Sequence, residues 1–132
     1  MRVITGKAKG RRLKAVKGMN TRPTSDRVKE ALFAILGTAV VDATVLDLFA
    51  GTGSLGIEAL SRGARFCVFV DKDRRAVSVI RDNISATGFA EQALILPVDA
   101  LGSFSKMAER GYRFDLVLCD PPYRIEAAAD IL

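Results

Sequence analysis

Asp120-Pro121-Pro122-Tyr123 combines a carboxylate, two prolines and a phenol ring directly after the apolar stretch at 114–119. The prolines fix the backbone and leave carbonyl oxygens with no competing N–H. A carboxylate and a carbonyl together accept both hydrogens of an exocyclic amine, and the ring offers a face on which a planar base stacks. We interpret the four residues as a site for a nucleobase amino group. A rigid turn closing a buried strand is the alternative.

A second candidate site is the glycine-rich stretch VLDLFAGTGSLG, which runs from Val45 to Gly56. It is typical of a buried parallel strand, a tight turn at Gly51 and Gly53, and the start of a helix. The first amides of such a helix point toward a ligand in the turn. Ligands of open α/β sheets bind at this place, beyond the carboxyl ends of the strands.

The glycine stretch leaves two ligand classes open. Gly51, Gly53 and Gly56 match the G-x-G-x-x-G pattern of dinucleotide enzymes, and Asp71 follows Gly51 by 20 residues, as that pattern requires. An NAD-binding dehydrogenase domain is therefore an alternative. Asp47 favours the other class, because a carboxylate four residues before Gly51 would repel a pyrophosphate and suits a positively charged ligand. A glycine turn without any cofactor is the third interpretation.

Each predicted strand finishes with an acid near its carboxyl end, and these ends share one edge of a parallel sheet: Asp47, Asp71, Asp99 and Asp120. Asp71 is suited to ribose hydroxyls, Asp99 to an adenine amino group, and Asp47 to a nearby cation. The ligand described by these acids is a nucleoside with positive charge and without phosphates.

The elements that position these residues alternate along the chain. Strands are predicted at 44–49, 65–71, 92–97 and 114–119, and helices at 25–36, 53–62, 72–86 and 101–110, with another beginning at about 125. This alternation predicts a parallel sheet with helices on both faces. The first helix should begin at a Thr24 or Ser25 cap, end at Gly37 and bury one face, which we assign to Val28, Leu32, Ile35 and Leu36.

Composition limits the chemistry. The 132 residues, 49% of them hydrophobic, suffice for one core, and no apolar run approaches the ~20 residues of a membrane span. Without histidine, imidazole catalysis and most zinc sites are excluded, and no metal site is predicted. Cys67 and Cys119 lie in separate apolar strands, so we expect buried core residues and no disulfide. A soluble cytoplasmic protein is the expectation.

Positive charge is concentrated at the N-terminus. Residues 1–30 carry a net charge of +8 and residues 31–132 a net charge of −3, within a total of +5. Residues 2–18 alternate loosely between glycines, which predicts a short β-hairpin or extended arm. We divide the chain into a basic arm at 1–22 and a domain at 23–132, and expect the arm to contact nucleic-acid phosphates; a solvated tail is the alternative. The candidate RNA-binding residues are Lys7, Lys9, Arg11, Arg12, Lys14 and Arg22.

The chain resembles the class I S-adenosylmethionine-dependent methyltransferases that modify base amino groups, and above all the bacterial small-subunit ribosomal RNA guanine-N2 methyltransferases. The resemblance rests on four stretches: Arg2-Val3-Ile4-Thr5-Gly6, Thr21-Arg22-Pro23-Thr24, Leu46-Asp47-Leu48-Phe49-Ala50-Gly51-Thr52-Gly53 and Asp120-Pro121-Pro122-Tyr123. The last is shared with DNA adenine methyltransferases, so a DNA or RNA adenine-N6 methyltransferase stays an alternative. A non-catalytic RNA-binding module is a third class.

The resemblance implies a Rossmann-like fold that binds S-adenosylmethionine and methylates a guanine of 16S ribosomal RNA, free or in the assembling small subunit. We also expect a monomer without membrane contact. Asp120, Pro121, Pro122 and Tyr123 would hold the target guanine. The cofactor would contact Asp47, Phe49, Ala50, Gly51, Thr52, Gly53, Asp71, Lys72, Asp99 and Ala100. The family's complete sheet has seven strands in the order 3-2-1-4-5-7-6, so we expect a C-terminally truncated domain that lacks strands five to seven.

Overall fold

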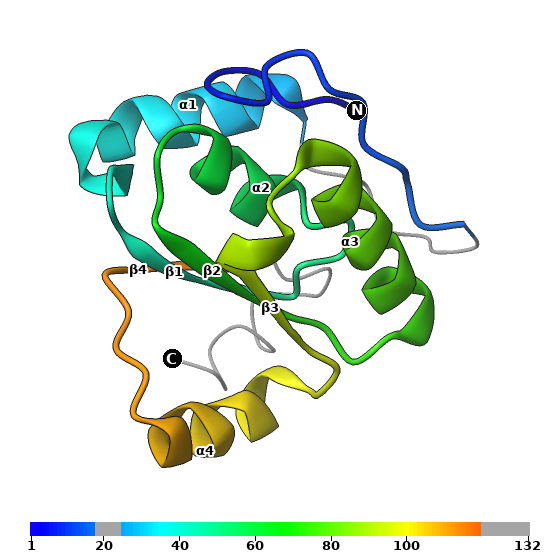
Figure 1. Ribbon diagram of the computed structural model, residues 1–132, viewed down its shortest axis with the longest axis vertical. Coiled ribbons are helices and arrows are strands. Elements are labelled where there is room, and N and C mark those ends of the chain that lie inside the picture. Colours follow the sequence, from blue (N-terminus) through cyan, green and yellow to red (C-terminus); the bar gives the residue numbers. More distant parts are fainter. Residues whose placement is uncertain (18–24, 120–132) are drawn as a thin grey trace.

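A computed structural model describes residues 1–17 and 25–119 (Figure 1). Its strands are β1 (Thr44–Leu48), β2 (Phe66–Val70), β3 (Ala93–Leu96) and β4 (Leu116–Cys119). They form a fully parallel sheet in the order β3-β2-β1-β4. The helices are α1 (Asp26–Leu36), α2 (Ser54–Ser61), α3 (Arg74–Thr87) and α4 (Ala100–Arg110), with short 3₁₀ helices η1 (Gly37–Val40) and η2 (Ala90–Gln92). The predicted helix beginning at about 125 lies outside the described residues.

Helices cover both faces of the sheet, as the alternating pattern predicted. In Figure 1, α1, α2 and α3 lie on one side of the strands and α4 on the other. Successive strand residues point to opposite faces, so Val45, Cys67 and Phe69 join the core under α2, while Leu46 and Val68 join the core under α4. A strand buried on both faces is apolar along its whole length, which explains the continuous apolar runs in the sequence.

Helix α1 packs through a face that matches the predicted one only in part: Leu32 and Leu36 contact the core, but Val28 and Ile35 do not. Its limits agree with the pattern, because the Ser25 side chain accepts from the Val28 amide and Gly37 ends the helix. However, Val28 is 55% exposed and Ile35 is 83% exposed. The buried positions are Lys29 and Phe33, with Leu32 and Leu36 partly buried beside them. A lysine occupies an inward position because its ammonium group finds buried oxygen partners there.

The N-terminal segment, which we define as residues 1–17, forms a hairpin that packs into the main core. Arg2 and Arg12 form an antiparallel bridge, which confirms the predicted hairpin. Val3, Ala8 and Leu13 are buried in the same apolar cluster as β1 and α2. The segment therefore contributes to the core and also carries cations on its outer surface. The predicted boundary near residue 22 falls at 18–24, outside the described residues, and stays a prediction.

Only one of the two cysteines is buried. Cys67 lies inside β2 and is fully buried, whereas Cys119 at the end of β4 is exposed, so its predicted burial was wrong. Cys119 pairs with Leu48 at the edge of the described sheet. Its neighbour on the same face, Val117, is also exposed, because the apolar cluster under α4 draws its strand residues from β1, β2 and β3. Among the described residues, no helix has the length and apolar character needed to cross a membrane.

Candidate active site

The loop that links β1 to α2 has an unusual backbone. Phe49, Gly51 and Gly53 all have positive φ angles, of 56°, 59° and 82°. A side chain on Gly51 would meet nothing closer than the Phe49 carbonyl oxygen at 3.9 Å, so this turn faces open space. Gly56 serves packing instead, because a Cβ there would lie 2.3 Å from the Phe69 ring. The three glycines thus separate into two that shape the loop and one that admits the helix onto β2.

Asp71 fixes the glycine loop against the end of β2. Its Oδ2 accepts a hydrogen bond from the Gly51 amide at 2.9 Å, and its Oδ1 accepts from the Asp73 amide at 2.9 Å. The Ala50 amide donates to the Val70 carbonyl at 3.0 Å, which extends the contact between the two strand ends. Each carboxylate oxygen retains further acceptor capacity. The structure therefore brings together Gly51 and Asp71, two residues that the sequence assigned to one site.

Asp47 is buried within β1 and holds the start of α2. Its Oδ2 accepts from the Gly56 amide at 3.0 Å, an arrangement that places negative charge at the positive end of the helix. Burial, and secondly the charge of Asp47, raise the pKa of the Cys67 thiol well above its usual range. Cys67 is consequently an uncharged core residue and not a nucleophile.

Asp99 lies after β3 and caps α4. Its side chain accepts from the Gly102 amide, and Ala100 begins the helix as a buried residue. Lys72 follows Asp71 and is exposed. Because the strands are parallel, the ends of β1, β2 and β3 carry Asp47, Asp71 and Asp99 along one edge of the sheet. This row of acids suits a nucleoside lying across three strand ends, and the half-buried turn at Gly51 leaves space for it, since a Cβ there would meet only the Phe49 carbonyl oxygen at 3.9 Å.

The predicted catalytic residues Asp120, Pro121, Pro122 and Tyr123 lie outside the described residues. The last described residue of β4, Cys119, pairs with Leu48 at the end of β1. The role of these four residues stays a prediction from the sequence.

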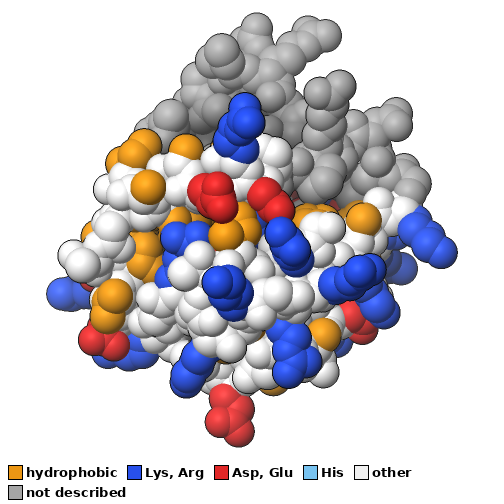
Figure 2. Space-filling model, turned by 90° about the horizontal axis from the view of Figure 1, so that it is seen from above, with side chains coloured by type: hydrophobic (Ala, Val, Ile, Leu, Met, Phe, Trp, Pro, Cys, Tyr) orange, Lys and Arg blue, Asp and Glu red, His pale blue; other side chains and the backbone are white. Residues whose placement is uncertain are grey.

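The predicted RNA-binding cations are exposed on the N-terminal segment, apart from Arg22, which lies outside the described residues. Figure 2 shows Lys and Arg side chains spread over the face seen from above, with fewer acids among them. Lys14 forms an ion pair with Asp82 of α3 at 3.2 Å. Within the described residues, no ion pair engages the side chains of Lys7, Lys9, Arg11 or Arg12. These four cations are available to phosphates.

Sequence reasoning missed a buried polar cluster behind the glycine loop. Lys29 and Glu58 are both 0% exposed and lie 3.4 Å apart. The Lys29 ammonium also donates to the Arg2 carbonyl and to Ser54 Oγ, each at 2.9 Å. Glu58 accepts from the Ile4 and Thr5 amides and from Arg62. The available signal was Glu58 as the one charged residue within the stretch 53–61.

A second missed residue is Asn83, a polar side chain on the buried face of α3 between Ile80 and Ile84. It hydrogen bonds both to Lys14 and to Thr52 of the glycine loop. An asparagine in an otherwise apolar helical stripe was the signal.

Within residues 1–17 and 25–119, no three Cys, Asp or Glu side chains gather as a metal site would require.

The fold and site define a class of protein. A parallel sheet in the order β3-β2-β1-β4, with a glycine loop after β1 and an acid after β2, is the Rossmann-like arrangement found in methyltransferases of known structure. A solved structure titled "Putative methyltransferase yhhF from Escherichia coli" superposes with a TM-score of 0.79 and 39% identity, over 94% of this chain and 65% of that one. A hypothetical protein of Thermus thermophilus reaches a TM-score of 0.85 at 33% identity, over 98% of this chain and 73% of that one.

Sequence relatives agree with the fold. The "Putative rRNA methyltransferase YlbH" of Bacillus subtilis is 45% identical over 94% of this chain and 67% of its own length. The "Ribosomal RNA small subunit methyltransferase D" of Escherichia coli K12 is 40% identical over 94% of this chain and 61% of its own length. This chain thus spans about two thirds or less of these relatives. It belongs to the family described as "Conserved hypothetical protein 95", which matches residues 1–132. The resemblance inferred from the motifs is confirmed.

Proposed function

We propose that this protein is an S-adenosylmethionine-dependent methyltransferase that modifies the exocyclic N2 amino group of a guanine in 16S ribosomal RNA. The observation that carries the proposal is the hydrogen bond that joins Gly51 to Asp71 across the ends of β1 and β2. The names of the bacterial relatives, which specify ribosomal RNA methyltransferases, support the substrate class. The guanine N2 group follows from the family resemblance of the motifs.

The described residues fit the cofactor. Gly51 leaves open space at the turn, and the carboxylate of Asp71 has acceptor capacity for ribose hydroxyls. Asp99 would accept from the adenine amino group beside Ala100. Asp47 and Asp71 place negative charge along this edge, which favours a sulfonium and disfavours a pyrophosphate. This charge pattern is the reason to prefer S-adenosylmethionine to NAD.

The bound cofactor would supply an electrophilic methyl group. Asp120 and a proline carbonyl would accept hydrogen bonds from the guanine amine, and Tyr123 would stack on the base. This holds the amine nitrogen in line with the methyl carbon, so catalysis relies on alignment and on polarisation of the amine. The amine nitrogen would gain the methyl group and release one proton to solvent, while the carbon–sulfur bond of the sulfonium breaks and S-adenosylhomocysteine leaves as a neutral thioether. The chemistry requires neither histidine nor a metal ion.

The exposed cations of the N-terminal segment would bind the RNA backbone. Phosphate contacts of this kind position a substrate without reading its sequence. We infer that the protein works as a cytoplasmic monomer on ribosomal RNA, free or in an assembling small subunit.

Ligand-induced stabilisation tests the cofactor class. S-adenosylhomocysteine at 100 times its Kd should stabilise the folded protein by about 2.7 kcal/mol, seen as a higher melting temperature, and NAD should have no effect. Stabilisation by NAD alone would support the dehydrogenase alternative instead.

Transfer of labelled methyl groups to 16S ribosomal RNA, followed by nucleoside analysis, tests which base is modified. N6-methyladenosine as the product would overturn the guanine assignment, and RNA binding without transfer would indicate a non-catalytic module.

A further inference from the structure

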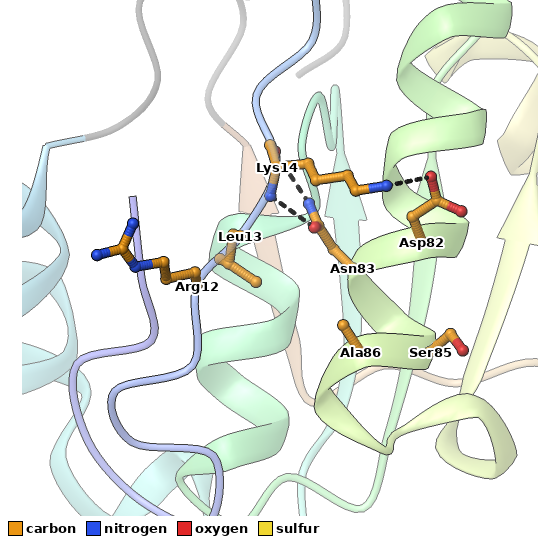
Figure 3. A pocket seen from close by; sticks show the side chains of 7 residues that line it. All are labelled: Arg12, Leu13, Lys14, Asp82, Asn83, Ser85 and Ala86. Carbon is orange, nitrogen blue, oxygen red and sulfur yellow. Dashed lines mark hydrogen bonds and ion pairs between the residues drawn. The ribbon is translucent and has the colours of Figure 1, made fainter.

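Asn83 connects two segments that are distant in the sequence. It is 1% exposed on α3, and its Oδ1 accepts from the Lys14 amide at 2.7 Å. Its Nδ2 donates to the Lys14 carbonyl at 3.1 Å and to the Thr52 carbonyl at 2.8 Å. Figure 3 shows Asn83 directed at the Lys14 backbone, with the Lys14–Asp82 ion pair beside it. Both amide hydrogens and one acceptor site are therefore in use.

The bond to Thr52 fixes a peptide group inside the glycine loop. The Thr52 carbonyl and the Gly53 amide belong to one planar unit, so holding the carbonyl also sets the direction of the amide. That amide donates to the Ala50 carbonyl at 2.8 Å. Gly51 and Gly53 adopt positive φ angles without steric cost but leave the backbone of the loop several accessible conformations, so a contact from outside the loop restricts it to one.

The hydrogen bonds to Lys14 connect Asn83 of α3 to the N-terminal segment. Two hydrogen bonds to the same residue fix the orientation of the amide plane. A second connection runs parallel to it, because Lys29 joins the Arg2 carbonyl to Ser54 Oγ. The segment that carries the candidate RNA-binding cations is thus connected to Thr52 of the loop through Asn83 and to Ser54, the first residue of α2, through Lys29, and the Thr52 hydroxyl also donates to Met1 Sδ at 3.5 Å.

We propose that Asn83 is a positioning residue for cofactor binding, which holds the glycine loop in its binding conformation by fastening Thr52 to the N-terminal segment. The inference rests on the proposed function, and it adds that residues 1–17 support the cofactor site as well as the RNA. Asn83 itself need not touch either ligand.

Asn83→Asp is the direct test. The substitution keeps the size and the acceptor for the Lys14 amide, but it turns a carboxylate oxygen toward the carbonyls of Lys14 and Thr52. The Kd for S-adenosylhomocysteine, measured by calorimetry well below the melting temperature, should rise about tenfold or more, a scale of about 1.4 kcal/mol. The matched control is Ile84→Val, which trims the neighbouring apolar side chain. It should lower the melting temperature and leave the Kd within twofold.

Protonation offers a second readout. Below the pKa of the introduced carboxyl group, the Asn83→Asp side chain regains one donor. The ratio of its Kd to that of the parent should therefore fall as the pH is lowered, whereas the same ratio for Ile84→Val should stay flat. In methyl transfer, Asn83→Asp should raise the KM for S-adenosylmethionine about tenfold and leave kcat within about threefold.

Lys14→Pro tests the anchor from the other side and serves if Asn83→Asp does not fold. Proline removes the amide that donates to Asn83, while Lys14→Ala removes the same charge and keeps the amide. S-adenosylhomocysteine should bind more weakly to Lys14→Pro than to Lys14→Ala.

Failure of the parent to bind S-adenosylhomocysteine would refute the proposed function. Parent-like cofactor affinity in folded Asn83→Asp, or in folded Lys14→Pro, would overturn the role of Asn83 alone.

Discussion

Asp47 and Asp71 at the strand ends each accept backbone hydrogen bonds, and these bonds determine how each residue can be tested by substitution. Asp71 receives one backbone amide on each oxygen, whereas Asp47 receives the Gly56 amide and is buried. A change at Asp47 would therefore disturb the start of α2, and its effect on a ligand would be hard to separate from folding. Asp71 is only partly buried and is the better probe of the cofactor site.

Asp71→Asn should weaken cofactor binding about tenfold or more. An asparagine must turn its NH₂ group toward either the Gly51 amide or the Asp73 amide, because both oxygens of Asp71 accept from amides. It also removes one negative charge from this edge of the sheet. Calorimetry with S-adenosylmethionine measures the effect, and RNA affinity should not change. If cofactor affinity matched that of the parent, the assignment of Asp71 to the ribose would be wrong.

Asp120→Asn should show the opposite profile. The substitution keeps the size of the side chain but replaces an acceptor oxygen with a donor group. We expect methyl transfer to fall by roughly 10²-fold or more, the scale expected when a positioned polar group is lost at the reacting centre. Cofactor affinity should stay within a few-fold. Single-turnover rates equal to those of the parent would show that the Asp120–Tyr123 motif is only a rigid turn and does not bind the amine.

At the scale of elements, α1, α2 and the N-terminal hairpin meet at one buried ion pair. Lys29 contributes from α1 and Glu58 from α2, and the hairpin supplies the Arg2 carbonyl and two amides. Burying two charges costs free energy unless every partner is present. Every buried side-chain nitrogen and oxygen among the described residues has a partner. The pair therefore specifies how the three elements dock.

Lys29→Met should destabilise the fold by up to about 3 kcal/mol, the lower end of the range for breaking a buried ion pair, because Glu58 loses its buried cation but keeps the ion pair with Arg62. It also removes the donor to the Arg2 carbonyl and Ser54 Oγ. Denaturant unfolding measures the loss. Glu30→Gln, at the exposed neighbouring position, is the control and should stay within about 0.5 kcal/mol of the parent. An equally small change for Lys29→Met would show that the ion pair is dispensable.

The start of α3 should give a pH-dependent stability. Asp73 caps this helix, and the Arg75 side chain, followed by the Arg75 amide, lowers the pKa of the Asp73 carboxyl group. A lowered folded-state pKa stabilises the fold above the ordinary aspartate pKa of about 4, and the benefit is lost as the pH falls through the folded-state value. Asp73→Asn keeps a capping oxygen. Its stability deficit against the parent should therefore be present at neutral pH and vanish in acid.

At the scale of the whole molecule, the candidate RNA-binding cations that the structure describes all lie on the N-terminal hairpin. The basic hairpin lies on the side of the sheet that α1, α2 and α3 cover, and α4 lies on the other side (Figure 1). Deleting the hairpin would also remove the buried side chains of Val3, Ala8 and Leu13. Charge substitutions on the exposed positions consequently test RNA binding more cleanly than deletion does.

Lys9→Gln combined with Arg11→Gln should weaken RNA binding at low salt and reduce its salt dependence. Each lost phosphate contact lowers the slope of log K against log salt by about 0.7 to 0.9. Filter binding over a range of salt concentrations measures both effects, and S-adenosylhomocysteine affinity should be unchanged. Lys106→Gln on α4 is the control for removing one exposed charge. An unchanged salt slope in the double variant would exclude the hairpin cations from the RNA contact.

The sequence by itself determined the elements, the parallel sheet and the glycine loop, because these depend on local patterns. Continuous apolar runs predicted four strands within a few residues of the observed limits, and parallel alternation placed Asp47, Asp71 and Asp99 at one edge. Only the tertiary structure decided which polar residues enter the core. Lys29 displaced Val28 and Ile35 from the buried face of α1 because its partners lie 25 to 29 residues away. Asn83 likewise bonds to residues 31 and 69 positions distant. Burying a polar group is tolerated only when the fold brings a hydrogen-bond partner next to it. The partners of Lys29 and Asn83 are distant in the sequence, so no local sequence pattern could predict these hydrogen bonds.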